Sequence, residues 1–416
     1  MTITLHKPEA PIAGSVFLPG SKSISNRVLM IKALSGLDFH LNNESNSDDT
    51  QHLIKALSLI NSTASGTIDI GHAGTDMRFL TAYLSLKQGS FELTGSERMQ
   101  QRPIKELVDV LRSLGADISY KNREGYPPLA ISGKKLKGGK ATIKGSVSSQ
   151  FISALLLVAP YFELGLELAI EEDIVSKPYI DMTMEIMKAF GAEVSWQGHK
   201  INVKPVAYRY SKTAYAVESD WSAASYYYSF VALSPAGTKL SLKGLFKNSL
   251  QADAVCASIY THFGVETHYS EEEILIIKTT DLTTPTFEYN FINCPDIAQT
   301  LVCTGIAMNR PFYFTGLQTL KTKETDRIEA LKTELKKLDR VIEITANTMK
   351  YYSEAASINK KELIVSTYKD HRMAMSFAAF ALLLDGIVIK DAEVVTKSYP
   401  TFWEDLNAIG IRTQLM

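Results

Sequence analysis

Short polar clusters, rich in residue types that bind phosphate and carboxylate groups, open apolar stretches at six points of the chain. The densest one spans residues 19–27, Pro-Gly-Ser-Lys-Ser-Ile-Ser-Asn-Arg. Glycine lets the backbone approach a ligand, and serines at a helix start can cap the helix or donate outward. Lys22 and Arg27 add charge at the positive end of the helix dipole, which predicts an anion site. The alternative is an ordinary N-cap with solvated basic neighbours, and the Walker spacing is absent.

Other polar helix starts follow in the first half of the chain. They are Ala-Gly-Thr at 73–75, Arg-Pro at 102–103, Ser-Ser-Gln at 148–150 and Ser-Lys-Pro-Tyr at 176–179. One helix end is a weak anion trap, but several helix ends brought together with Lys22, Arg27 and Arg102 would make a strong one.

The second half supplies a different set of charged residues. Lys-Glu-Thr-Asp-Arg at 323–327 is followed by Asp-His-Arg at 370–372 and Thr-Lys at 396–397. Arg327 and Arg372 are of the residue type that grips a carboxylate with two parallel hydrogen bonds. Asp296 and Glu324 are candidate acid–base groups, with pKa values that such cations could tune.

Simpler interpretations of these residues stay open. Glu324 and Arg327, three apart on a helix, could form an exposed salt bridge of little worth. The acidic residues that open three of the clusters could be plain N-caps; they are Asp220, Asp296 and Asp370. His371, beside Arg372, is more typical of a structural histidine than of a base. The eight histidines do not pair at metal spacing, so we expect no metal.

The clusters recur with a nearly constant period. They start at residues 23, 75, 148, 220, 296 and 370, in steps of about 52, 73, 72, 76 and 74 residues. A second series of helical stretches begins near residues 48, 102, 177, 250, 324 and 398, with similar steps. Two interleaved series with one period predict six copies of one unit, the first of which lacks about 20 residues.

The apolar pattern assigns the elements of each copy. Residues 104–114 and 180–190 have one apolar stripe each, typical of amphipathic helices, and Gly115 and Gly191 follow as expected left-handed caps. Residues 151–159 and 373–384 are apolar on nearly every side and should be buried helices. Strand-like runs follow the caps, as in 116–120. The fold class is therefore α/β, with buried helices inside and sheets outside, the inverse of the usual barrel.

Six copies divide naturally into two domains of three repeated α/β units. The boundary then falls near residue 219, and the opening strand can belong with the second half. We expect residues 20–218 to form an N-terminal-type domain. Residues 1–19 and 219–416 should form a discontinuous C-terminal-type domain.

Composition excludes several classes of protein. The formal net charge of −1 argues against a broad nucleic-acid surface, and the scattered cations suit a compact anionic ligand better. Three cysteines without paired spacing indicate a reducing compartment. The first residues lack the apolar core of a signal peptide, and the longest apolar run is too short to span a bilayer. We expect a cytoplasmic monomer that binds no membrane.

Seven ordered motifs resemble the 5-enolpyruvylshikimate-3-phosphate synthase family. They are residues 19–27, Ala-Gly-Thr-x-x-Arg (73–78), Arg-Pro-Ile (102–104), Val-Ser-Ser-Gln-Phe (147–151), Ser-Lys-Pro-Tyr (176–179), Lys-Glu-Thr-Asp-Arg (323–327) and Asp-His-Arg-Met-Ala-Met (370–375). The resemblance implies two domains of three α/β units each, an inside-out α/β barrel with the active site in the interdomain cleft. It also implies a transferase of the shikimate pathway, which leads to chorismate and the aromatic amino acids. The family moves the enolpyruvyl group of phosphoenolpyruvate to the 5-hydroxyl of shikimate 3-phosphate, releases phosphate, and uses no metal or organic cofactor.

The resemblance also assigns roles to individual residues. Asp296 would be the base facing the 5-hydroxyl, and Glu324 would move a proton at the substrate methylene with help from Lys22. Shikimate 3-phosphate would be held by Lys22, Ser23, Arg27, Ser148, Ser149, Gln150, Ser176, Tyr179, Asp296 and Lys323. Phosphoenolpyruvate would be held by Lys22, Gly74, Arg102, Gln150, Arg327, Arg372 and Lys397.

The chain departs from the family's pattern at three positions. His72 replaces an asparagine, Phe79 a proline, and Thr319 an asparagine that contacts substrate. Two rival functions stay open. One is the sister transferase that acts on UDP-N-acetylglucosamine, although residues 96–101 lack its usual cysteine and Ser23 replaces its asparagine. The other is a catalytically silent protein that binds phosphometabolites, which the presence of both Asp296 and Glu324 disfavours.

Overall fold

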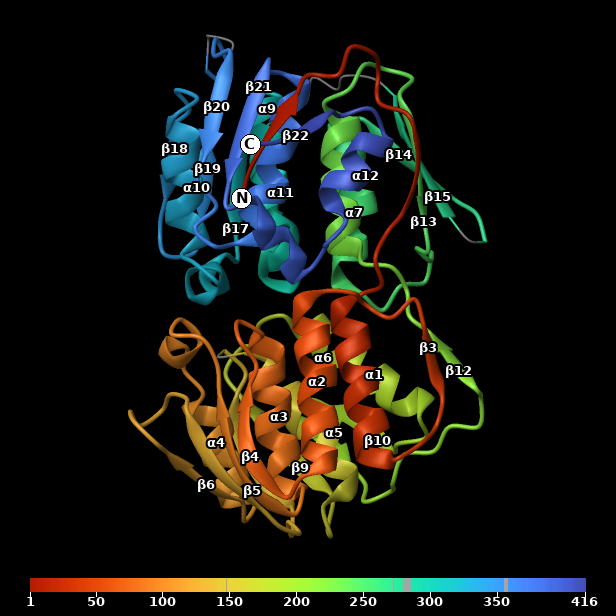
Figure 1. Cartoon of the computed structure of the whole chain (residues 1–416), viewed down its shortest axis with the longest axis vertical. Coiled ribbons are helices and arrows are strands. Elements are labelled where there is room, and N and C mark those ends of the chain that lie inside the picture. The colour runs from red at the N-terminus through yellow and green to blue at the C-terminus, as the bar shows by residue number, and fades with distance from the viewer. Residues whose placement is uncertain (147, 272, 280–285, 355–357) are drawn as a thin grey trace. The chain divides into compact units, whose positions relative to one another are not determined.

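The computed structural model describes residues 1–146, 148–271, 273–279, 286–354 and 358–416 (Figure 1). Val147, which opens the 147–151 motif, lies outside the described residues. The chain divides into two compact units: unit N is Ser21–Val217, and unit C combines Met1–Gly20 with Glu218–Met416. Both are built of helices and mixed sheets, which confirms the α/β class.

Two sheets of unit N share one strand order, in which the first two strands are parallel and the other two antiparallel. In chain order the elements around the first sheet are β4 (Ser65–Asp69), α3 (Gly74–Leu86), β5 (Gly89–Thr94), α4 (Lys105–Ser113), β6 (Asp117–Tyr120) and β7 (Leu129–Gly133). Those around the second are β8 (Gly139–Lys144), α5 (Ser149–Val158), β9 (Leu166–Glu171), α6 (Lys177–Ala189), β10 (Val194–Gln197) and β11 (Lys200–Val203).

The first copy in unit N is shorter. It holds α1 (Lys22–Ser35), β3 (His40–Asn42) and α2 (Asp48–Ser62), and its sheet has two parallel strands, β3 and the late strand β12 (Ala214–Ala216). The antiparallel pair that completes the other sheets does not follow α2. Since that pair occupies residues 117–133 in the next copy, its loss accounts for the short first step in the sequence period.

Unit C has three four-stranded sheets with the same order. The first group is β2 (Gly14–Phe17), α7 (Trp221–Ala232), β13 (Lys239–Lys243), α8 (Cys256–Ile259), β14 (Val265–Tyr269) and β15 (Glu273–Lys278). The second is β16 (Phe287–Asn290), α9 (Ala298–Ala307), β17 (Phe312–Thr315), α10 (Arg327–Lys336), β18 (Ile342–Ile344) and β19 (Met349–Tyr351). The third is β20 (Glu362–Val365), α11 (His371–Ala378), β21 (Gly386–Lys390), α12 (Phe402–Ala408), β22 (Thr413–Leu415) and β1 (Thr2–His6).

Burial follows the predicted pattern. The helices α5, α7, α9 and α11 are buried along almost their whole length, whereas α4 buries one face. Within unit N, α1, α3 and α5 pack on one another, and within unit C α9 packs on α7 and α11. Gly115 and Gly191 have positive φ angles of 104° and 78°, as expected for left-handed helix caps.

The stretch predicted to be helical from residue 250 is more broken than expected. It consists of the 3₁₀ helix η3 (Ala252–Val255), α8 with four residues, and the 3₁₀ helix η4 (Tyr260–Phe263). Its apolar side chains Cys256, Ile259 and Phe263 are nevertheless buried, so the segment keeps the packing role of the second helix.

The strand β1 gives a direct stability prediction. It pairs with β21 on one side and β22 on the other, and Leu5 is fully buried while Thr4 lies on the other face. We expect Leu5→Ala to lower the free energy of unfolding by about 2–5 kcal/mol, because it leaves a cavity in the core. Thr4→Ala should cost no more than about 0.5 kcal/mol. Denaturant unfolding of both variants checks this, and equal losses would contradict the described register.

Candidate functional site

In unit N, the polar helix starts predicted from the sequence come together. Lys22, Gly74 and Ser149 are the first residues of α1, α3 and α5. The Gln150 amide donates to Thr75 Oγ1 at 3.2 Å, and the Asn26 amide donates to Asp76 Oδ1 at 2.8 Å. These contacts join the N-terminal ends of three helices, so the positive dipole ends of these helices lie in one region.

Lys22 has a specific partner. Its Nζ lies 2.9 Å from Oδ2 of Asp49, in the first turn of α2, and that carboxylate is almost fully buried. The helix start is fixed in turn, because Ser47 caps α2 and Thr50 donates to Asn26 Oδ1 at 2.7 Å. Sequence reasoning did not select Asp49, although two acidic residues at a helix start were visible.

Arg27 lies deeper than the sequence suggested. Its guanidinium donates to Thr183 Oγ1 at 2.7 Å and to the carbonyls of Ser23 and Tyr179 at 2.8 and 3.3 Å. It also lies over the ring of Phe79, 5.5 Å from the ring centroid. Burial lowers the pKa of Arg27 to about 10. In this arrangement Arg27 holds α1 against α6, and a ligand must compete with these bonds to reach it.

Gly74 and Arg102 are in direct contact. A β-carbon at Gly74 would lie 2.5 Å from Nη1 of Arg102, so glycine is needed for this approach. Arg78 supports the pair, because it donates to the Gly74 carbonyl at 3.0 Å and to the Pro103 carbonyl at 3.2 Å. Burial, and secondarily the charge of Arg102, lower the pKa of Arg78 well below its usual value. Two guanidiniums thus adjoin the start of α3.

The remaining predicted residues of unit N are at helix starts, as expected. Ser148 caps α5 and accepts from the Gln150 backbone N–H at 3.3 Å. Ser176 precedes α6 with a φ of +54°, a left-handed conformation that is unfavourable for serine. Such strain is found most often at functional sites. Tyr179 lies in the first turn of α6.

In unit C, Arg327 is the centre of a cluster of acidic groups. Its guanidinium lies 2.7 Å from Asp370, 2.9 Å from Glu324 and 3.3 Å from Asp296. The Arg327 side chain is 1% exposed, which excludes the exposed salt bridge that the sequence left open. Although burial lowers the pKa of Arg327, the carboxylates Asp370 and Glu324 outweigh it and raise the pKa above its usual value.

Arg372 and two lysines complete the cluster. Arg372 Nη2 lies 3.2 Å from Oδ2 of Asp296, Lys323 Nζ lies 3.4 Å from its Oδ1, and Lys397 Nζ lies 3.3 Å from Oε1 of Glu324. Burial lowers the pKa of Lys323, and the carboxylate of Asp296 partly offsets this effect. The two candidate acid–base groups are therefore each held by several cations.

The three aspartates that could have been caps differ. Asp220 caps α7, and Asp370 caps α11 while also binding Arg327. Asp296 lies in the 3₁₀ turn before α9, where three cations surround its carboxylate. Its environment is typical of a group with an electrostatic role. His371 is buried and lies 3.7 Å from Asp370, consistent with a structural role.

Tyr226, on the buried helix α7, also contacts this cluster. Its hydroxyl accepts from Arg372 Nη1 at 3.4 Å, and Ser222 Oγ accepts from Arg372 Nη2 at 3.3 Å. Burial raises the pKa of Tyr226 to about 12, against the opposing charges of Arg372 and Arg327. Ser222 and Tyr226 both lie on α7, one turn apart. Their spacing of four residues was the signal available in the sequence.

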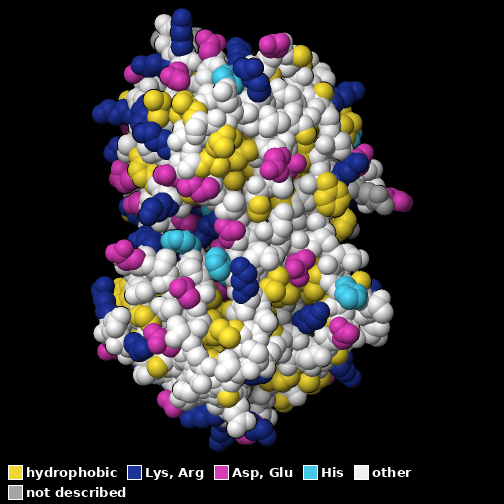
Figure 2. Space-filling model, viewed as in Figure 1, with side chains coloured by type: hydrophobic (Ala, Val, Ile, Leu, Met, Phe, Trp, Pro, Cys, Tyr) yellow, Lys and Arg dark blue, Asp and Glu magenta, His cyan; other side chains and the backbone are white. Residues whose placement is uncertain are grey.

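Charges on the molecular surface are mixed in sign. Figure 2 shows Lys and Arg side chains interspersed with Asp and Glu side chains over the face that it presents. Among the described residues on that face, no basic stripe of the kind that binds nucleic acid is present. The helices of the described residues are all too short or too polar to cross a membrane.

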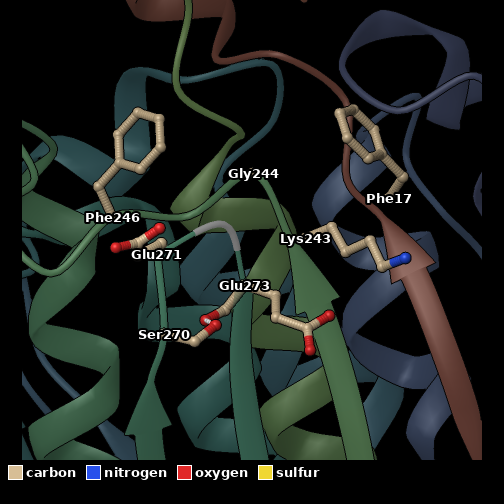
Figure 3. A pocket seen from close by; sticks show the side chains of 7 residues that line it. All are labelled: Phe17, Lys243, Gly244, Phe246, Ser270, Glu271 and Glu273. Atoms are coloured by element: carbon tan, nitrogen blue, oxygen red, sulfur yellow. Dashed lines mark hydrogen bonds between the residues drawn. The ribbon is translucent and has the colours of Figure 1, made fainter.

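One cavity of ≈ 650 Å³ lies in unit C, away from these residues. Figure 3 shows its lining, with the rings of Phe17 and Phe246 on either side of Gly244 and the carboxylate of Glu273 below them. Ser241 donates to Glu273 at 2.6 Å. None of the residues selected from the sequence lines this cavity, so it is not part of the candidate site.

The chain is similar to several known proteins. The family model of EPSP synthase (3-phosphoshikimate 1-carboxyvinyltransferase) matches residues 6–65 and 58–406. A 3-phosphoshikimate 1-carboxyvinyltransferase of Bacteroides fragilis is 48% identical over 400 residues, 96% of each chain. One of Photobacterium damsela subsp. piscicida is 37% identical, over 96% of this chain and 97% of that protein. The fold of the EPSP synthase of Acinetobacter baumannii is similar, with a TM-score of 0.79, 22% identity and full coverage of both chains.

The α/β fold and these matches define the class of the protein as a carboxyvinyl transferase. The chain belongs to the EPSP synthase (3-phosphoshikimate 1-carboxyvinyltransferase) family.

Proposed function

We propose that the chain transfers the enolpyruvyl group of phosphoenolpyruvate to the 5-hydroxyl of shikimate 3-phosphate and releases phosphate. The observation that carries this proposal is the cluster around Arg327, in which Asp296 and Glu324 contact different nitrogens of one guanidinium. Addition of an alcohol to the double bond of an enol phosphate needs one group that takes a proton from the hydroxyl and another that gives a proton to carbon. Asp296 and Glu324 fit these two roles.

The reaction then proceeds by addition and elimination. Asp296 takes the proton of the 5-hydroxyl while the oxygen of that hydroxyl attacks C2 of phosphoenolpyruvate. Glu324 gives a proton to C3, which becomes a methyl group. In the second step Glu324 takes a proton back from C3, the double bond reforms, and the bond from C2 to the phosphate oxygen breaks. The departing phosphate takes up the proton that came from the 5-hydroxyl, so that Asp296 is again ionised. Lys22 assists at the methylene. The surrounding cations stabilise the charge that develops on the substrates.

The substrates are divided between two sets of residues. Shikimate 3-phosphate is held by Lys22, Ser23, Arg27, Ser148, Ser149, Gln150, Ser176, Tyr179, Asp296 and Lys323. Phosphoenolpyruvate is held by Lys22, Gly74, Arg102, Gln150, Arg327, Arg372 and Lys397. This division is supported by the polar helix starts of unit N and by the arginines of unit C, which suit phosphate and carboxylate groups.

We further propose that units N and C are the two domains of an inside-out α/β barrel, with the active site in the cleft between them. The buried helices and the repeated sheet order within each unit support this. Closure upon substrate binding would bring the two sets of residues together and exclude water. We propose a cytoplasmic monomer without metal or organic cofactor, in line with its three buried free cysteines.

One assay separates this function from its rivals. Phosphate release from phosphoenolpyruvate is measured with shikimate 3-phosphate, with UDP-N-acetylglucosamine and without an acceptor. We expect release with shikimate 3-phosphate alone. Release with the UDP-sugar instead would indicate the sister transferase, and no release with either acceptor would indicate a silent binding protein.

Gly74→Ala tests the phosphoenolpyruvate site in unit N. The added β-carbon would displace the Arg102 guanidinium, so we expect KM for phosphoenolpyruvate to rise about tenfold or more, the equivalent of roughly one charge-assisted hydrogen bond. KM for shikimate 3-phosphate should change little. Steady-state kinetics with each substrate varied checks this. Gly36→Ala, at a left-handed helix cap with a φ of +66°, strains the backbone away from Arg102 and so controls for a loss of stability alone. An unchanged KM for phosphoenolpyruvate would remove Arg102 from that site.

A further inference from the structure

Asp253 is a buried carboxylate beside the Arg327 cluster that the proposed reaction does not use. It lies in η3, and its side chain is almost fully buried. Oδ2 accepts a short hydrogen bond from the hydroxyl of Ser222, in the first turn of α7. Within the described part of the chain, Oδ1 has no hydrogen-bond partner. A buried carboxylate with one satisfied oxygen is costly, which suggests a purpose beyond packing.

A separate set of bonds fixes the position of Asp253. The Gln251 amide accepts from the Trp221 backbone N–H at 3.1 Å and donates to the Ser219 carbonyl at 2.8 Å. It also donates to Glu218 Oε2 at 2.9 Å, which accepts from Ser249 at 2.7 Å as well. Residues 249–253 are therefore tied to residues 218–222. This arrangement holds Asp253 against Ser222 without any ligand.

Ser222 connects Asp253 to the candidate active site. Arg372 Nη2 donates to Ser222 Oγ at 3.3 Å and lies 3.2 Å from Asp296 Oδ2. Since the Ser222 hydroxyl donates to Asp253, its oxygen is free to accept from Arg372. We propose that Asp253 is a positioning residue that, through Ser222, orients the Arg372 guanidinium between Asp296 and bound phosphoenolpyruvate. This inference rests on the proposed function.

The charge of Asp253 also depends on pH in the neutral range. Burial, and secondarily the charge of Asp296, raise the pKa of Asp253 to about 7, against the opposing effect of Arg372. The other titratable groups that act on it or feel its charge are Asp220, Cys256, Cys294 and Tyr289. Ionisation above pH 7 adds a negative charge beside Arg372. That charge should weaken the binding of an anionic substrate there.

The test compares Asp253→Ala, Asp253→Asn and Ser222→Ala with the wild-type enzyme at pH 6 to 8.5. Asp253→Ala and Ser222→Ala should raise KM for phosphoenolpyruvate about tenfold at every pH, because Arg372 loses its support. Asp253→Asn keeps an acceptor for Ser222, so its KM should match the wild-type value at pH 6 and should not rise through pH 7 as the wild-type value does. The dissociation constant of shikimate 3-phosphate should stay within about twofold.

Glu334→Gln is the matched control. Glu334 is a buried carboxylate in the same unit that accepts from Ser366 and Tyr368 and lacks contact with Arg372. Glu334→Gln should lower the melting temperature and leave KM for phosphoenolpyruvate and the pH profile of this KM unchanged. A wild-type KM in Asp253→Ala, or the same rise through pH 7 in Asp253→Asn, would overturn the inference while phosphate release by the wild-type enzyme upholds the proposed function. A wild-type enzyme that releases no phosphate would overturn both.

Stability provides a readout that does not need turnover. The folded pKa of Asp253 is raised above its unfolded value, so the native state binds its proton more tightly. The corresponding stability is present below pH 4 and is lost as pH rises through 7. The melting temperature of the wild-type enzyme should therefore fall relative to that of Asp253→Asn between pH 5 and 8. A difference that stays constant over this range would contradict the raised pKa.

Discussion

Asp296→Asn is expected to lower kcat by about 10²–10⁴-fold, the usual contribution of a positioned general base. The amide keeps the size of the side chain but cannot take the proton of the 5-hydroxyl. Asp296 also contacts three cations, so some loss of substrate affinity should accompany the loss of turnover. Single-turnover measurement of phosphate release, at saturating concentrations of both substrates, separates the chemical step from binding.

Asp326→Asn is the matched control for this experiment. Asp326 caps α10 by accepting from the N–H groups of Ile328 and Glu329, and asparagine is an equally good cap. This variant loses one negative charge beside Arg327 in sequence but should keep kcat within about twofold. If Asp296→Asn kept as much activity as Asp326→Asn, Asp296 would not be the base.

Arg327→Met is expected to have the largest effect on stability. Removal of one partner of a buried ion pair leaves an uncompensated charge, which typically costs about 3–5 kcal/mol. Arg327 is 1% exposed and balances Asp296, Glu324 and Asp370, of which Asp370 is fully buried. Unfolding in guanidinium chloride should show this loss of stability. Activity should be abolished, because both candidate acid–base groups lose the guanidinium that they share.

Lys332→Met provides the comparison on the same helix. Lys332 forms an exposed pair with Glu329 at 4.0 Å, which should contribute less than about 1 kcal/mol. If Arg327→Met were as stable as Lys332→Met, the ion pairs of Arg327 would not contribute to the stability of unit C.

The sequence predicted the repeated organisation because one period governs both burial and helix starts. The short first step of about 52 residues indicated a missing piece, and the structure explains it by the absent antiparallel pair after α2. It did not predict that β12, 174 residues after β3, supplies the second strand of that sheet, since strand pairing over such separations leaves no local signal.

The charged motifs identified most residues of the candidate site but not their partners. The spacing of Glu324 and Arg327 predicted one contact, between these two residues. The burial of Arg327 in the structure distinguishes this contact from an exposed salt bridge. Lys22 with Asp49 joins two helices of the first copy, and Arg372 with Ser222 and Tyr226 joins helices of different copies, so spacing along one helix cannot reveal these contacts. The burial of Arg27 could not be predicted for the same reason, because its guanidinium donates to Thr183 and Tyr179 of α6, which the local motif does not contain.

The most direct test of the account measures kcat/KM for phosphoenolpyruvate in Arg102→Met and Arg372→Met, one arginine from each unit. Loss of a charged contact with the substrate, worth about 2–5 kcal/mol, predicts a fall of about 30-fold or more in both variants. The dissociation constant of shikimate 3-phosphate, measured by calorimetry, should change little in either. A wild-type kcat/KM in one of the two variants would mean that a single unit binds phosphoenolpyruvate, and would contradict a site built from both.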